Sequence, residues 1–107
     1  MPREIVLAPE AIEDFKALRA YDRAMVRDAL ETHLRHEPDK TSKSRIKRLR
    51  GMRRPQYRLR VSDVRVFYDI GDEAVEVLAI VPKNDATAWL DRYGQRDESD
   101  REGKETT

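Results

Sequence analysis

The stretch YRLRVSDVRVFYDI, residues 57–70, constrains the fold more than any other part of the chain. Apolar and polar residues alternate along it, and the phase of the alternation reverses at Ser62-Asp63. A period of two predicts β-strands, and the phase reversal between them predicts a hairpin with a two-residue turn. Such a turn fixes the register of the hairpin, and it sets Arg60 directly opposite Arg65.

The same register predicts that three arginines share the sheet face that is turned away from the core: Arg58, Arg60 and Arg65. Like charges directly opposite each other on neighbouring strands destabilise a hairpin. Arginine keeps its charge at any working pH, and its planar fork of donors matches a phosphate group. We therefore favour a functional anion site on this face. The alternative is a solvated face whose acidic partners come from another segment.

The charge distribution along the chain supports an anion site. Residues 40–65 hold eleven lysines and arginines and one acid, whereas the whole chain has a formal net charge of +1. A segment of +10 within a remainder of −9 suggests a local site for a polyanion, with nucleic acid the obvious candidate. A basic loop that only keeps the protein in solution is the alternative, and composition does not separate the two.

The N-terminal half of the chain predicts a strand followed by two helices. Residues 3–9 favour a short strand, and Pro9 suits the first turn of a helix. Asp22 is the expected N-cap of a second helix, which Glu37-Pro38-Asp39 would end. Residues 39–55 would connect this helical hairpin to the sheet. The apolar residues of that connection fit one helical turn: Ile46, Leu49 and Met52.

The C-terminal half predicts one more strand and a helix. Residues 74–82, AVEVLAIVP, are nearly all apolar and favour a strand that is covered on both faces. Asn84 or Asp85 would cap a last helix that Gly94 ends. Residues 1–94 would thus form one α+β domain, in which the helical hairpin packs on a small, twisted, mainly antiparallel sheet of about four strands. Residues 95–107 are predicted to be a disordered polar tail.

Several kinds of site are not expected. The absence of cysteine excludes disulfides and thiolate ligands, and no spacing of His, Asp or Glu resembles a metal site. We therefore expect no metal and no cofactor. No apolar run is long enough to span a membrane, so a cytoplasmic protein without a membrane contact is expected. His33 and His36 lie on the second helix, where core or surface roles are more common than catalysis.

The motif YRLRVSDVRVFYDIGDEAVEVLAIVPK, together with the preceding strand, helical hairpin and LRG segment, resembles the RelE/ParE toxins of bacterial type II toxin–antitoxin systems. The resemblance covers residues 3 to about 93. It implies, for the RelE-type branch, a ribosome-dependent mRNA endoribonuclease, or mRNA interferase, that inhibits translation. Cleavage in that branch is metal-independent and uses attack by the 2′-OH on the adjacent phosphate.

The resemblance also implies roles for particular residues. The catalytic positions of the RelE-type branch fall here on Arg58, Arg60, Arg65 and Lys83. The functional tyrosine of that branch aligns with Trp89, or its role passes to Tyr93. Lysine at 83 lacks the bidentate fork, and tryptophan at 89 can stack on a base but has no hydroxyl. Further RNA-binding residues are expected to be Lys47, Arg48, Arg50, Arg53, Arg54 and Phe67.

The partners implied by the resemblance are a cognate antitoxin protein, the ribosome with its mRNA, and operator DNA only through the antitoxin complex. Two other functions remain open at this point. One is ParE-like inhibition of DNA gyrase. The other is a non-catalytic co-repressor role together with the antitoxin.

Overall fold

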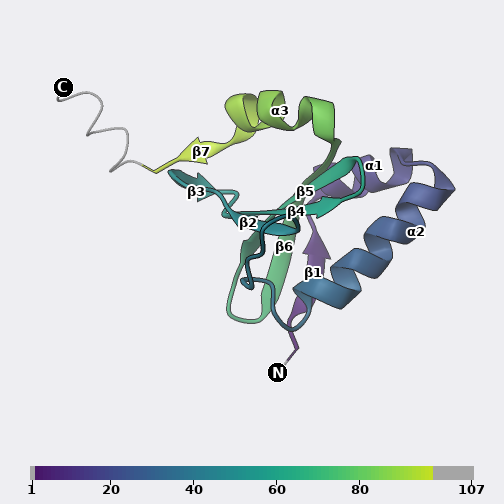
Figure 1. The fold of residues 1–107 in the computed structure, drawn as a ribbon, viewed down its shortest axis with the longest axis horizontal. Coiled ribbons are helices and arrows are strands. Elements are labelled where there is room, and N and C mark those ends of the chain that lie inside the picture. Colours follow the sequence, from purple (N-terminus) through teal and green to yellow (C-terminus); the bar gives the residue numbers. More distant parts are fainter. Residues whose placement is uncertain (1, 98–107) are drawn as a thin grey trace.

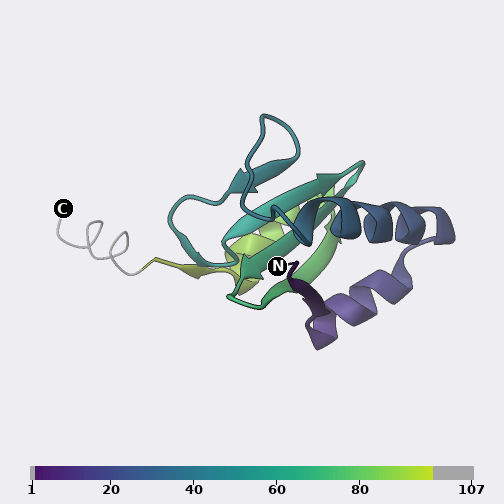
Figure 2. The ribbon, with the colours of Figure 1, turned by 90° about the horizontal axis from the view of Figure 1, so that it is seen from below.

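The computed structural model describes residues 2–97. A five-stranded sheet lies between two layers of helix: α1 and α2 cover one face and α3 lies against the other (Figures 1 and 2). The elements in chain order are β1 (Glu4–Leu7), α1 (Pro9–Ala17), α2 (Ala20–Ala29) continued by a π-helical turn (Leu30–Leu34), β2 (Ile46–Arg48), β3 (Met52–Arg54), β4 (Tyr57–Val61), β5 (Val64–Ile70), β6 (Ala74–Pro82), a 3-10 turn (Lys83–Asp85), α3 (Ala86–Tyr93) and β7 (Gln95–Arg96). The predicted α+β fold is confirmed.

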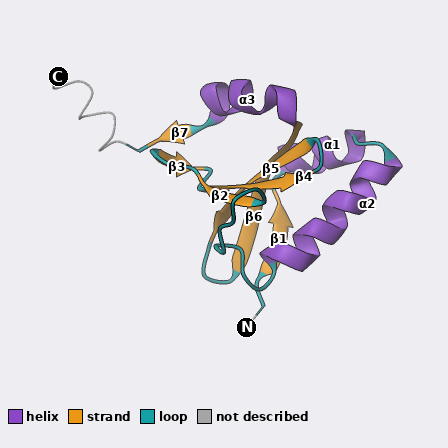
Figure 3. Cartoon of the chain, in the orientation of Figure 1, coloured by secondary structure: helices purple, strands orange, loops and turns teal. Residues whose placement is uncertain are grey.

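The strands of the main sheet are ordered β1-β6-β5-β4-β2, and only the β1–β6 pair is parallel. Strands β3 and β7 pair separately, beside α3 (Figure 3). The expected helical turn in the connection is wrong, because Ile46 begins β2 and Met52 begins β3. The physical reason is that β4 would otherwise leave a row of backbone donors and acceptors unpaired, which β2 satisfies.

The start of α2 also differs from the prediction. Arg19, and not Asp22, is the N-cap residue, and the helix begins at Ala20. Asp22 lies in the first turn instead, where a carboxylate favours the helix dipole, and it lies 3.6 Å from the Arg19 guanidinium. By contrast, Pro9 opens α1 as predicted. No helix within residues 2–97 combines the length and the apolarity needed to cross a membrane.

Strand β6 packs against both layers, as its apolar sequence predicts. The register with β5 slips by one residue at Leu78, because Phe67 pairs with Ala79 while Tyr68 pairs with Val77. This bulge shifts the alternation of side chains between the two faces of β6 by one residue. As a result, Val77 and Ile80 face the helical hairpin, while Ala79 and Val81 face α3. The main core lies between the sheet and the α1–α2 hairpin, and a smaller core lies beneath α3.

The C-terminal segment confirms one prediction and changes another. Asp85 and Gly94 flank α3 as predicted. Gly94 has an ordinary φ of −69°, so it is required by space: a Cβ there would meet Met52 Cε and lie 2.6 Å from the Leu90 carbonyl oxygen. Gln95–Arg96 forms β7, so the expected tail begins with a paired strand. Residues 98–107 of that expected tail lie outside the described part of the chain.

Candidate nucleic-acid interface

The β4–β5 hairpin has the register that the sequence predicts. Val61 pairs with Val64, and Arg60 pairs with Arg65. The two-residue turn is possible because Ser62 takes a positive φ of 53°, the region that two-residue hairpin turns demand at their first position. The local turn chemistry therefore fixes which side chains oppose each other across the hairpin.

Strand β2 adds a fourth cation to the three predicted ones. Lys47 pairs with Arg58 in the β2–β4 register, and residues paired across strands present their side chains on the same face. We call this set the arginine face; it consists of Lys47, Arg58, Arg60 and Arg65. It comes from three adjacent strands, and a single strand pair could not provide a surface of this width.

Arg58 is the most informative residue of the arginine face. Its side chain is half-buried, and its Nε atom is buried without a hydrogen-bond partner within residues 2–97. Burial lowers the pKa of Arg58, and the charges of Arg65 and Arg60 lower it further. A buried donor without an acceptor costs free energy, and more so when the donor is charged. An anion bound at Arg58 would supply the missing acceptor.

Arg60 and Arg65 differ in how they are held. Arg60 is exposed, and its guanidinium makes no hydrogen bond or ion pair within the described residues. Arg65 donates from one nitrogen to the carbonyl oxygens of Ser62, at 2.9 Å, and Val64, at 3.1 Å. Burial and Arg60 lower the pKa of Arg65, and Asp63 acts in the opposite direction. The pair thus offers one fixed and one free guanidinium.

The fold brings Lys83 to the tip of the same hairpin. The Lys83 backbone N–H donates to the Asp63 carbonyl oxygen at 2.8 Å. Its Nζ lies 3.9 Å from Asp63 Oδ1, a loose pair in which the Asp63 side chain is 88% exposed. Such an exposed pair contributes little to stability. Lys83 can therefore exchange this carboxylate for another anion at small cost.

The two aromatic residues predicted to contact RNA stack on each other. The rings of Phe67 and Trp89 are nearly parallel, at an angle of 7° and with their centroids 5.0 Å apart. Phe67 pairs with Arg58 in the register but is 0% exposed. This burial argues against the RNA-binding role expected of Phe67, since α3 covers its ring. Trp89 is half-buried, and its ring continues to Tyr93 at 5.7 Å.

The remaining basic residues predicted for RNA fall into two groups. Three are used within the fold: Arg48 donates to the Leu49 and Gln56 carbonyl oxygens at 2.8 Å, Arg53 to Gln95 Oε1 at 2.9 Å, and Arg54 to Glu76 at 2.9 Å. Lys47 and Arg50 are exposed, with no such partner in residues 2–97. Of the five basic residues in these two groups, Lys47 and Arg50 are the ones available to a nucleic acid without breaking an internal contact among residues 2–97.

None of the four residues of the arginine face is a histidine or a carboxylate. Asp69 is occupied by the Gln56 N–H at 2.7 Å and by Arg54 at 3.3 Å. Burial raises the pKa of Asp69, although these two partners lower it. His33 and His36 line a pocket at the end of α2. Within residues 2–97, no group of three or more His, Asp or Glu side chains could hold a metal ion. The face can bind and stabilise negative charge.

Sequence reasoning missed Arg45. Its carbonyl oxygen accepts the Arg60 N–H at 2.8 Å, so Arg45 lies at the entrance to β2 beside the arginine face. The alternation Arg45-Ile46-Lys47 carries a strand signal, but it is too short to compete with the helical spacing of Ile46, Leu49 and Met52. Only the pairing of β2 with β4 reveals it.

Comparisons with known proteins identify relatives of this fold. Residues 5–86 match a family described as ParE toxin of type II toxin-antitoxin system, parDE. The RelBE2 toxin–antitoxin complex of Mycobacterium tuberculosis contains a chain that is 23% identical, with a TM-score of 0.61 over 77% of this chain and 99% of that one. A chain of the archaeal RelE–RelB complex of Pyrococcus horikoshii OT3 is 24% identical, with a TM-score of 0.59 over 78% and 97%. No curated protein matches the chain by sequence.

Proposed function

We propose that this chain, which belongs to the ParE toxin family of type II toxin–antitoxin systems within the RelE/ParE superfamily, is a ribosome-dependent mRNA endoribonuclease that inhibits translation. The observation that carries this proposal is the unpartnered, half-buried Arg58 between Lys47, Arg60 and Arg65. An arrangement of cations that lacks its own acid partners suits a phosphodiester.

The proposed reaction is attack of a 2′-OH on the adjacent phosphate. The phosphorus gains a bond to the 2′ oxygen and loses its bond to the 5′ oxygen, which leaves a 2′,3′-cyclic phosphate and a 5′-hydroxyl end. Charge accumulates on the phosphate oxygens in the transition state, and Arg58, Arg60 and Arg65 would stabilise it. This role requires no metal ion. Lys83 would neutralise phosphate charge of the RNA strand beside the hairpin turn.

Within residues 2–97, the arginine face has no histidine or carboxylate to take the 2′-OH proton, so water or a ribosomal group would accept it and would return a proton to the departing 5′ oxygen. Trp89 would stack on a base next to the cleaved bond, and Lys47 and Arg50 would contact ribosomal or messenger RNA. This division of labour supports a toxin that acts only on the ribosome, where the RNA is held in line. The proposed location is accordingly the cytoplasm.

An antitoxin is the proposed protein partner. The family description names a toxin–antitoxin system, and the solved neighbours are toxin–antitoxin complexes. Operator DNA would be bound through that complex only.

A second candidate function is inhibition of DNA gyrase. The match of residues 5–86 to the ParE family favours it, and so does the arginine face, whose four residues include no histidine or carboxylate. A third candidate is a co-repressor that acts with its antitoxin and cleaves nothing. Lys83 and Trp89 depart from the catalytic residues of the RelE-type branch, and these departures favour the second and third candidates.

The test is inducible expression of the wild type, Arg60→Ala and Arg65→Ala, with mapping of mRNA 5′ ends after growth stops. Arg60→Ala is the sharper variant, because the Arg60 side chain makes no contact that holds the fold. We expect new 5′-hydroxyl ends within translated frames for the wild type and a decrease of about 100-fold or more in each variant. Arg19→Ala, at an arginine that is 89% exposed at the N-cap of α2, is the matched control and should cleave normally.

Two results would replace the proposal. Growth arrest with intact mRNA and trapped gyrase–DNA complexes would establish the gyrase function. No arrest, together with operator binding by the toxin–antitoxin complex, would establish the co-repressor function.

A further inference from the structure

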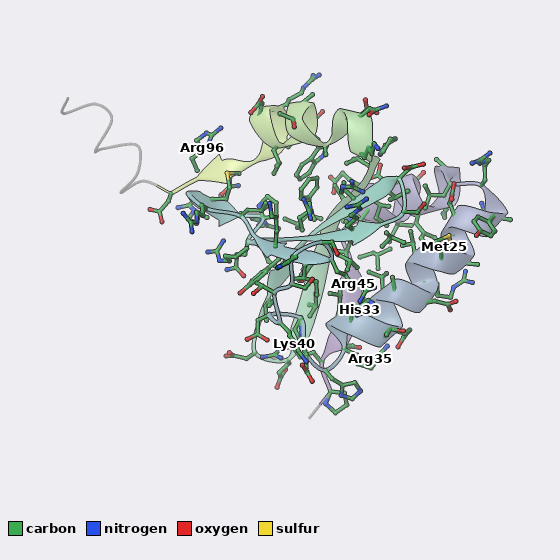
Figure 4. The ribbon with its side chains drawn as sticks, viewed as in Figure 1. Met25, His33, Arg35, Lys40, Arg45 and Arg96 are labelled. Carbon is green, nitrogen blue, oxygen red and sulfur yellow. The ribbon has the colours of Figure 1, made fainter. Side chains whose placement is uncertain are left out.

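A second basic site lies at the far end of α2. It is a pocket of about 370 Å³ between the π-helical turn, the following loop and the start of β2. We call it the histidine pocket, and its polar lining includes His33, His36, Glu37, Lys40, Ser42 and Arg45. Figure 4 shows His33, Lys40 and Arg45 gathered at this end of α2. No role in the proposed cleavage falls on any of them.

The donors of the histidine pocket outnumber its acceptors. The Arg45 guanidinium and both imidazole rings make no hydrogen bond or ion pair within residues 2–97. Ser42 Oγ accepts the N–H groups of Arg45, at 2.9 Å, and Ile46, at 3.2 Å, so its hydroxyl proton remains available. The one acid of the lining, Glu37, already contacts Lys40 at 3.3 Å.

The pKa of His33 reflects the positive electrostatic potential of the pocket. Burial of the half-buried ring lowers the pKa of His33, and the charge of Arg45 lowers it further. An anion in the pocket would act in the opposite direction, since it favours the imidazolium form. The Arg45 guanidinium, the Ser42 hydroxyl and the His33 imidazolium would then all be available as donors to that anion.

The histidine pocket and the arginine face meet at one strand. Arg45 lines the pocket with its side chain, and its carbonyl oxygen accepts the Arg60 N–H at 2.8 Å. Two residues further on, Lys47 lies on the arginine face opposite Arg58. Strand β2 is the edge of the sheet, so no further strand separates the two sites.

We propose that the histidine pocket is a second phosphate site, which receives a backbone phosphate of the RNA strand that the arginine face holds. The inference rests on the proposed function for the identity of the strand. Phosphate contacts of this kind set the position of a nucleic acid without reading its sequence. The pocket would therefore fix where the RNA crosses the β2 edge, and so which phosphate reaches Arg58.

The chain offers a site-specific probe, because its two histidines both line the pocket. The first measurement is an NMR titration of the histidine ring signals of the full chain with inorganic phosphate, against chloride at equal ionic strength. We expect saturable shifts of both rings and a rise of the His33 pKa with phosphate only. Arg45→Gln should raise the His33 pKa without phosphate, because a repelling charge is gone, and should lose the response to phosphate.

The second measurement is binding of a short single-stranded RNA over a range of salt concentrations. Arg45→Gln should bind about tenfold more weakly, and the slope of log affinity against log salt should decrease by about one. Arg19→Gln is the matched control and should leave both unchanged. Arg60→Gln should weaken RNA binding but keep the response of the histidine rings to inorganic phosphate.

Three other results would each overturn one part of the proposal. Histidine signals that do not respond to phosphate beyond the chloride control would overturn the pocket. If the wild type responds to phosphate as expected but Arg45→Gln binds RNA with unchanged affinity, the pocket would be assigned to free phosphate. The proposed path of the RNA would then be overturned. Intact mRNA on expression, with both responses as expected, would overturn the cleavage function and leave the pocket standing.

Discussion

Two arginines of the same segment show how a single residue acquires its role. Arg54 lies 3.3 Å from Asp69 and 2.9 Å from Glu76, so its charge is matched by two acids. Arg58, four residues later, has no acid partner within residues 2–97, and its Nε is buried there without a hydrogen-bond partner. The first guanidinium stabilises the junction of β3 with the sheet. Under the proposed function, the second guanidinium binds an external anion.

At the same scale, Asp14 has a role that follows from the bulge at Leu78. Its Oδ2 accepts the Ile80 N–H at 3.0 Å, where the register of β5 and β6 slips. We expect Asp14→Ala to lower the free energy of unfolding by about 1–2 kcal/mol, because it leaves this donor without an acceptor. Urea denaturation measures the change. Glu13→Ala, at a residue 75% exposed in a loose pair with Lys16, should change stability by less than about 0.5 kcal/mol. Equal effects of the two substitutions would contradict this role.

At the scale of the element, the β4–β5 hairpin depends on its turn. Ser62 is the non-glycine residue with positive φ in the described chain, and Asp63 has a negative φ. This combination fits a hairpin turn in which only the first of the two turn residues has a positive φ. The turn then sets Arg60 against Arg65, and the repulsion of these two charges acts against the hairpin.

The two turn positions should respond oppositely to glycine. Ser62→Gly removes the clash of a Cβ at φ 53° and should stabilise the protein by about 0.5–1 kcal/mol. Asp63→Gly adds freedom to the unfolded chain without relieving strain, so it should destabilise by a similar amount. Thermal unfolding should show Tm values that move in opposite directions by about 2–8 °C. A lower Tm for Ser62→Gly would show that the turn does not have this conformation.

For the whole molecule, the sheet separates two apolar layers of unequal size. The main core joins the sheet to α1 and α2, and the smaller one joins it to α3 through Phe67, Ala79 and Val81. The smaller core lies on the same face as the arginines, so α3 covers one part of that face and leaves the cations open. The packed residues that stabilise the fold and the cations proposed to bind RNA thus occupy neighbouring parts of one surface.

This arrangement predicts that Phe67 affects stability and not RNA binding. Phe67→Leu keeps an apolar side chain but loses the stack on Trp89, and should lower the free energy of unfolding by about 1–2 kcal/mol. RNA affinity of the folded variant should stay within about twofold of the wild type. Denaturation and RNA titration on the same preparation measure both. Weaker RNA binding at unchanged stability would restore Phe67 as a contact residue.

The amino-acid sequence by itself determined the hairpin, its register, the opposition of Arg60 and Arg65, the apolar β6 and the α+β class. These features follow from local periodicity and turn chemistry, which neighbouring residues specify. The tertiary structure decided the pairing of β2, the bulge at Leu78, the burial of Phe67 beneath α3 and the division of the cations into paired and free ones. Each of these depends on a partner distant in the chain, such as Glu76 for Arg54, and no local pattern records which distant group will arrive.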